Sequence, residues 1–132
     1  MISIVNIDHI VLHTNHNTSC MLHFYCEVLG CKIERELGEF NLIQLRAGNA
    51  IIDLISPEER AITGGYNSHA NVEHFCLTIH QAINSQLCEY FAKNAIEFST
   101  INNNYGAQGM GASIYIKDPC QNIVELKQDK PR

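Results

Sequence analysis

The sequence lacks the features that mark membrane, secreted and nucleic-acid-binding proteins. No stretch of the 132 residues approaches the roughly 18 consecutive apolar residues that a membrane-spanning helix needs, so we expect no membrane partner. The opening MISIVNIDHIVL has no basic segment and no small-residue cleavage site, and we therefore expect no signal peptide. The net charge is −5 and the nine Lys and Arg residues are scattered, which argues against a nucleic-acid partner.

Cysteine occurs six times but never in the C-x-x-C spacing of a metal knuckle or redox motif. Several of the cysteines lie among apolar neighbours, so we expect reduced, packed thiols in a cytoplasmic protein. With 45% hydrophobic and 17% charged residues, the composition is that of a soluble globular protein. The length suits one compact domain over residues 1–132.

An internal repeat is the main feature of the chain. Two pairs of segments repeat: IDHIVLHT (7–14) with VEHFCLTI (72–79), and NAIIDLI (49–55) with QNIVELK (121–127). In the first pair an acid precedes a histidine, which places His9 and His74 at matching positions. In the second pair an acid follows two apolar residues, which places Asp53 and Glu125 at matching positions.

Each copy of the repeat predicts a βαβββ module in a protein of the α+β class. A helical apolar pattern follows each histidine. The first ends at Gly30, and the second ends near Asn94, a residue type that tolerates the left-handed conformation. The two modules are expected at about residues 5–56 and 72–127, with a linker at about 57–71 that contains His69 and carries no chemistry. The further strands are expected at CKIERE, FNLIQLRA and AIIDLIS in the first module, and at IEFST, ASIYIKD and NIVELK in the second.

The two histidines and two acids can form one metal site. Side chains alternate between the faces of a strand, so a symmetric pairing of the copies would bring His9, His74, Asp53 and Glu125 together. Taken singly, each has an ordinary alternative, because a histidine near a strand start is often a surface or capped core residue and Glu125 could face water from an edge strand. Four such residues at matched positions of the repeat instead imply a bound ion or an enforced charge network. The set suits divalent Ni, Zn, Mn, Co or Fe.

A glycine-rich segment, NNNYGAQGMG, precedes the strand that leads to the turn at Asp118-Pro119. It absorbs the difference in length between the two copies. Three glycines in six positions indicate either a flexible flap over the site, with Tyr105 or Gln108 touching substrate, or a plain surface loop.

The segments IDHIVL, FYCEVLGCKI, VEHFCLTI and YIKDPCQNIVEL resemble the vicinal oxygen chelate superfamily, which includes glyoxalase I, extradiol dioxygenases and bleomycin resistance proteins. The resemblance covers residues 5–127. It implies a curled mixed sheet around a metal held by His9, Asp53, His74 and Glu125, often in a homodimer with sites at the module interface. Gln121 stands where the family usually has Gly. Asp53 stands where glyoxalase I usually has Glu, so it could bind the metal directly, through water, or not at all.

The resemblance implies a lyase or isomerase similar to lactoylglutathione lyase. Such an enzyme takes a small substrate with vicinal oxygens, which could be a glutathione or other thiol adduct. Glu125 would abstract a proton as the base, and the metal would stabilise the enediolate. Two alternatives remain open within the same superfamily. One is an extradiol dioxygenase or antibiotic-modifying thiol transferase that leaves Asp53 idle, and the other is a non-catalytic small-molecule-binding resistance protein.

Overall fold

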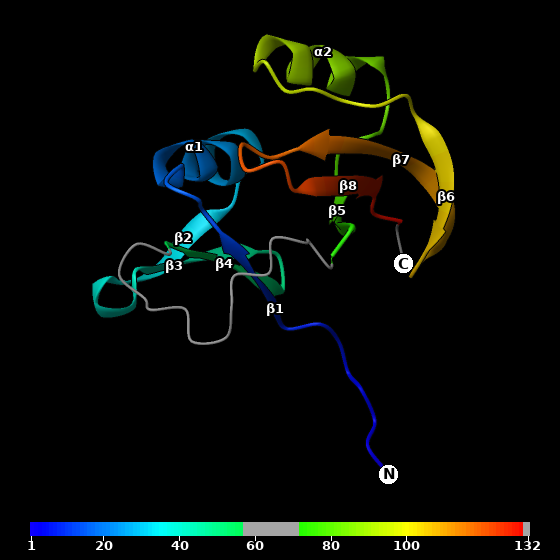
Figure 1. Cartoon of the computed structure of the whole chain (residues 1–132). Coiled ribbons are helices and arrows are strands. Elements are labelled where there is room, and N and C mark those ends of the chain that lie inside the picture. The colour runs from blue at the N-terminus through cyan, green and yellow to red at the C-terminus, as the bar shows by residue number, and fades with distance from the viewer. Residues whose placement is uncertain (57–71, 131–132) are drawn as a thin grey trace. The chain divides into compact units, whose positions relative to one another are not determined.

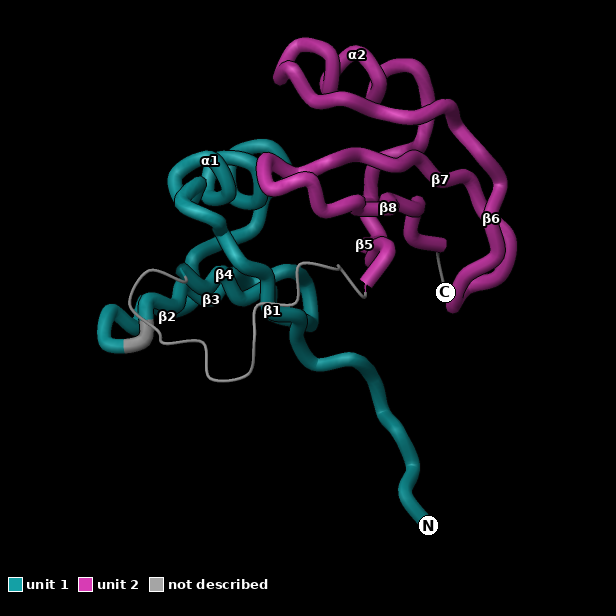
Figure 2. The backbone as a smooth tube through the Cα atoms, viewed as in Figure 1, with its two compact units in different colours: residues 1–66 teal, residues 67–132 magenta. Residues whose placement is uncertain are grey.

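The computed structural model describes residues 1–56 and 72–130. The chain divides into two compact units, residues 1–66 and 67–132 (Figure 2). The predicted linker at 57–71, with His69, lies outside the described residues. Each unit is described by itself below.

Unit 1 is a βαβββ module with a mixed four-stranded sheet. The strand order is β1-β4-β3-β2, in which β1 pairs parallel to β4 and the other neighbours pair antiparallel. The predicted helix and four strands are therefore confirmed. Its elements are β1 (His9–His13), α1 (Thr18–Leu22), the π-helix η1 (His23–Val28), β2 (Lys32–Leu37), the 3₁₀ turn η2 (Gly38–Phe40), β3 (Leu42–Ala47) and β4 (Ala50–Ile55).

The helical segment of unit 1 changes from α to π geometry before it ends. The backbone N–H of Leu29 donates to the carbonyl of Phe24, five residues earlier, as a π-helix requires. Gly30 then adopts φ +83°, a left-handed conformation that glycine takes without steric cost. The predicted stop at Gly30 is confirmed.

Unit 2 repeats the architecture of unit 1. Its strand order is β5-β8-β7-β6, and again the first strand pairs parallel to the last (Figure 1). The structure thus has two βαβββ modules whose mixed sheets each remain open. Its elements are β5 (His74–Ile79), α2 (Ser85–Lys93), β6 (Asn102–Gly106), β7 (Gly109–Lys117) and β8 (Ile123–Gln128).

Helix α2 is capped at both ends. The side chain of Asn84 accepts hydrogen bonds from the backbone N–H groups of Gln86 and Leu87, which satisfies two donors of the first turn. At the other end, Ala95 takes the left-handed conformation with φ +55°. The predicted helix end near Asn94 is confirmed, because Asn94 directly follows α2 with φ −95° and the left-handed residue comes next, at Ala95.

The glycine-rich segment forms a β-hairpin rather than a loop. Strands β6 and β7 pair antiparallel from Asn102 with Ser113 to Gly106 with Gly109, and a two-residue turn joins them. The prediction of a strand at IEFST is wrong, since Phe98 makes only an isolated bridge to Ile116 there. Asparagine and glycine disfavour strands, so propensity concealed β6 in the sequence.

The turn between β7 and β8 is fixed by Asp118. Its Oδ1 atom accepts hydrogen bonds of 2.9 Å from the backbone N–H groups of both Cys120 and Asn122. Gln121 has φ +69° within this turn. A left-handed backbone favours glycine, which is the residue expected at this position from the family resemblance.

The two faces of each sheet differ in polarity. In unit 2, β7 and β8 direct apolar side chains to the face along which α2 lies (Figure 1), while Glu125 and Lys127 belong to the opposite face. The helical segment of unit 1 likewise carries buried apolar side chains, among them Met21, Phe24 and Tyr25. Within the described residues, no helix is long and apolar enough to cross a membrane.

Candidate metal centre

The same strand register places one histidine and one acid on a single face of each sheet. In unit 1, Asp53 pairs with Val11, two positions after His9. In unit 2, Glu125 pairs with Cys76, two positions after His74. Paired residues on adjacent strands share a face, and so do residues two apart on one strand. Each unit therefore presents a histidine–acid pair with the same offset.

In unit 1, the imidazole of His9 is held by the residue that precedes it. Its Nδ1 lies 2.8 Å from Oδ2 of Asp8. This hydrogen bond, and then the charges of Asp53 and Asp8, raise the pKa of His9. With Nδ1 occupied, Nε2 is left to face a ligand, as in metal-binding histidines whose other nitrogen donates to a carboxylate.

The carboxylate of Asp53 is buried and incompletely bonded. The residue is 5% exposed, and within the described residues its Oδ1 has no hydrogen-bond partner. A buried carboxylate oxygen without a donor is costly, and such groups in native structures usually mark a functional demand or an unseen ion.

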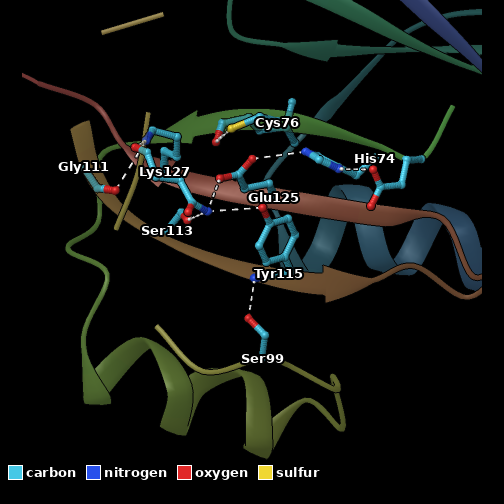
Figure 3. Close-up of polar contacts among 11 residues, drawn as sticks. His74, Cys76, Ser99, Gly111, Ser113, Tyr115, Glu125 and Lys127 are labelled. Carbon is cyan, nitrogen blue, oxygen red and sulfur yellow. Dashed lines mark hydrogen bonds and ion pairs between the residues drawn. The ribbon is translucent and has the colours of Figure 1, made fainter. Parts of the chain in front are cut away.

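In unit 2, His74 and Glu125 face each other directly. Nε2 of His74 lies 3.4 Å from Oε2 of Glu125, and its Nδ1 lies 3.9 Å from Oε2 of the preceding residue, Glu73 (Figure 3). The ring of Tyr115 packs edge-on against His74, with centroids 5.4 Å apart. Both units thus place an acid immediately before the histidine and a second acid on its sheet face.

Glu125 has a polar environment that the sequence analysis missed. Nδ2 of Asn104 donates to Oε1 of Glu125 at 3.2 Å, to the Tyr115 hydroxyl at 3.2 Å and to Oγ of Ser113 at 2.8 Å. Asn104 lies on β6, which was read as part of a loop. With the hairpin known, strand alternation would have placed Asn104 on the face of Glu125.

A lysine and a cysteine lie on the same face. Lys127 is buried, and its ammonium donates to the carbonyl oxygens of Asn104 and Gly111. Cys76 is exposed, but partial desolvation of its thiol, and then the charge of the neighbouring Glu125, raise its pKa to about 11. Cys76 is therefore a neutral thiol at neutral pH.

The two predicted substrate contacts lie away from Glu125. Tyr105 is 80% exposed and follows Asn104 on β6, so it points to the opposite face of the hairpin. Gln108 lies in the hairpin turn, where its Nε2 donates to Oδ1 of Asp129 at 2.7 Å and its Oε1 accepts from the backbone N–H of Lys130. A substrate contact by either residue remains a prediction.

A pocket of about 370 Å³ in unit 2 adjoins this cluster. His74 and Tyr115 line the pocket and also belong to the cluster around Glu125, so the pocket lies next to the histidine–acid pair of unit 2. Its lining combines apolar and charged side chains: Glu73, His74, Glu97, Phe98, Ser99, Tyr115, Ile116, Lys117 and Ile123.

The donor atoms suit a divalent transition metal. Two ligands of one ion, each at about 2.0–2.2 Å, lie roughly 3.0–3.5 Å apart, and the His74–Glu125 separation of 3.4 Å falls in this range. The unbonded oxygen of Asp53 offers a further donor. Across the described parts of the chain, no three His, Cys, Asp or Glu side chains group closely enough to hold an ion. The structure thus contains two pairs, one in each unit.

Sequence and structure comparisons agree on the class of protein that this fold defines. The model of the Glyoxalase/Bleomycin resistance protein/Dioxygenase superfamily matches residues 6–126. The chain belongs to this superfamily, as the resemblance of its sequence segments implied. No curated protein matches the sequence significantly.

Solved structures share the whole fold at low identity. An integron cassette protein from the mobile metagenome of V. cholerae has a TM-score of 0.80 and 22% identity, over 98% of this chain and 99% of that one. A virulence protein from Salmonella typhimurium has a TM-score of 0.72 and 26% identity, over 98% and 100% of the chains. Lactoylglutathione lyase from Agrobacterium tumefaciens has a TM-score of 0.67 and 21% identity, over 96% and 95%.

Proposed function

We propose that this chain is a metal-dependent lyase or isomerase of the glyoxalase type, acting on a small substrate with vicinal oxygens. His9, Asp53, His74 and Glu125 would hold the divalent ion. The observation that carries the proposal is the repeated histidine–acid pair, with the same register in both units. The unbonded oxygen of buried Asp53 supports it, because a cation would satisfy that oxygen.

Membership of a superfamily that includes enzymes and metal-binding proteins supports a catalytic function, and a lyase is among the similar structures. The proposal treats the two modules as one domain, and the four ligands would come from one chain or from the two chains of a homodimer. The proposal also includes a cytoplasmic location and a small-molecule substrate.

When bound, the ion would supply Lewis-acid stabilisation of the negative charge that develops on the substrate oxygens. The chain itself supplies the base. Glu125 would take a proton from the carbon next to one oxygen and return it to the neighbouring carbon, which isomerises the substrate without loss of atoms. Its Oε1 accepts the hydrogen bond from Asn104, while its Oε2 faces His74.

The remaining residues of the cluster would orient the substrate. The Tyr115 hydroxyl accepts a hydrogen bond from Asn104, which leaves its own proton free to be donated to a substrate oxygen. The raised pKa of Tyr115, caused first by desolvation and then by the charge of Glu125, keeps the hydroxyl protonated. The adjoining pocket would receive the body of the substrate.

Metal analysis tests the proposal first. Protein purified without chelators should contain close to one divalent ion per site, and chelation should abolish activity that the same metal restores. Hemithioacetal isomerisation is the first reaction to assay. Glu125→Gln should retain the fold and metal-free stability close to that of the wild type but lose turnover by about 10²–10⁴-fold. Undiminished turnover in this variant would exclude Glu125 as the base.

A further inference from the structure

Asn104 is the residue through which strand β6 reaches the candidate centre. Its amide is the donor to Oε1 of Glu125, while Oε2 of the same carboxylate faces His74 at 3.4 Å. Only the NH₂ end of an asparagine can face a carboxylate favourably, because its carbonyl end would repel the charge. The amide therefore holds the carboxylate in an orientation in which one oxygen is bonded to Asn104 and the other is directed to His74.

The position of Asn104 is itself fixed from two directions. Its backbone carbonyl accepts a hydrogen bond from the ammonium of buried Lys127, which also reaches the carbonyl of Gly111 across the hairpin. Its amide donates to Ser113 on β7 as well as to Tyr115. One asparagine thus joins three strands at the acid: β6 by its backbone, β7 through two hydroxyls and β8 through Glu125 and Lys127.

We infer that Asn104 is the positioning residue of Glu125, which holds the carboxylate with Oε1 turned away and Oε2 presented to the ion and the substrate. The inference rests on the proposed function and adds a residue to it. It also assigns a role to the β6–β7 hairpin. The hairpin carries the donor that fixes the base, and Tyr105, the neighbouring residue, faces away from Glu125.

Two matched variants separate positioning from general support. Asn104→Ala removes the donor, whereas Asn102→Ala removes the asparagine two positions earlier on the same strand face, whose amide reaches only the carbonyl of Thr100 at 3.4 Å among the contacts described. Asn104→Thr restores a hydroxyl donor on a side chain that suits a strand. Each protein is stripped of metal and titrated with Zn²⁺ or Ni²⁺ alone by calorimetry.

We expect Asn104→Ala to weaken metal binding by about 10–100-fold, the usual effect of losing an outer partner of a metal ligand. Asn104→Thr should recover part of that loss, and Asn102→Ala should bind as the wild type does. In a Glu125→Ala background, Asn104→Ala should weaken binding much less, because the amide acts through the carboxylate that this background lacks. Wild-type affinity in Asn104→Ala, or an equal loss in the Glu125→Ala background, would overturn the inference.

Urea unfolding of the metal-free proteins provides a readout that does not depend on metal. Wild type, Asn104→Ala, Glu125→Ala and the double variant form a cycle that measures the contact itself, because each single variant removes it. Non-additive stabilities support the positioning contact, and additive ones contradict it. If the wild type binds no metal while the cycle is non-additive, the proposed function fails but the orientation of Glu125 by Asn104 stands.

Discussion

The two units place their acids at the same register position but give them different surroundings. Asp53 of unit 1 pairs with Val11 and Gln44, and one of its oxygens has no hydrogen-bond partner within the described residues. Glu125 of unit 2 pairs with Cys76 and Tyr115 and accepts a hydrogen bond from Asn104. A duplicated fold can thus keep an acid at the same register position while only one of the two described copies surrounds it with a hydrogen-bond network.

Replacing the two acids by apolar residues should have opposite effects and gives the sharpest test of this difference. Glu125→Leu removes the charged acceptor of one Asn104 hydrogen bond and the partner of His74, so we expect the metal-free protein to lose about 1–3 kcal/mol in its free energy of unfolding. Asp53→Val removes a buried charge that lacks a full set of partners. It should leave that free energy unchanged or raise it by up to about 1 kcal/mol. Urea unfolding in the presence of a chelator measures both.

Equal losses in the two variants would show that Asp53 is as well supported as Glu125, and the contrast between the units would fail. Asp53→Asn and Glu125→Gln are the shape-matched controls. They distinguish the loss of charge from the loss of volume.

In the β6–β7 hairpin of unit 2, Gly106 lies against the side chain of Lys127. The glycines described in unit 1 have open space where a Cβ atom would stand. A Cβ atom at Gly106 would lie 3.2 Å from Cε of Lys127, whose ammonium is held by two carbonyls. Gly106→Ala should therefore destabilise the protein by about 1–2 kcal/mol. Gly111→Ala is the matched control, since its nearest approach to Lys127 is an ordinary 3.7 Å. Thermal unfolding compares the two, and equal midpoints would contradict the role of Lys127.

The sequence predicted the fold because its signals were local and repeated. Strand alternation around His9 and Asp53 was enough to place them on one face, and Gly30 marked the end of a helix. The surroundings of Glu125 were not predictable in the same way. Asn104 disfavours strands, and Gly106 accommodates a lysine that lies 21 residues away in sequence. Both are set by tertiary contacts, which propensity does not encode.

Thiols in both units make the protein sensitive to alkaline pH. Burial raises the pKa of Cys31 in unit 1 from 9.0 to about 11, and the pKa of Cys76 in unit 2 is raised to the same value. Because each thiol has a higher pKa when folded than when unfolded, its contribution to stability is complete below about pH 9 and is lost as the pH rises to about 11. Unfolding midpoints across this range should fall, and Cys31→Ala should reduce the fall.

Glu125→Gln allows the thiols of the two units to be compared. The charge of Glu125 contributes to the raised pKa of Cys76, whereas the second contribution at Cys31 comes from Cys26. Glu125→Gln should therefore lower the pKa of Cys76 and leave that of Cys31 unchanged. Alkylation rates of the two peptides as a function of pH, followed by mass spectrometry, measure this directly. A shift of both cysteines would indicate a general loosening of the fold.

The smallest expected effect concerns the residue that follows each helix. Gly30 and Ala95 occupy equivalent places with φ +83° and φ +55°, but only the first is glycine. An alanine in the left-handed region is strained by roughly 1 kcal/mol, part of which is offset because glycine loses more entropy on folding. Ala95→Gly should therefore raise the free energy of unfolding by less than about 1 kcal/mol. Ala92→Gly, inside the last turn of α2, should lower it by about 0.5–1 kcal/mol. If Ala95→Gly lowers the free energy of unfolding as Ala92→Gly does, the left-handed backbone of Ala95 carries no strain. Alanine would then serve at the end of α2 as well as glycine serves at the end of the helical segment of unit 1.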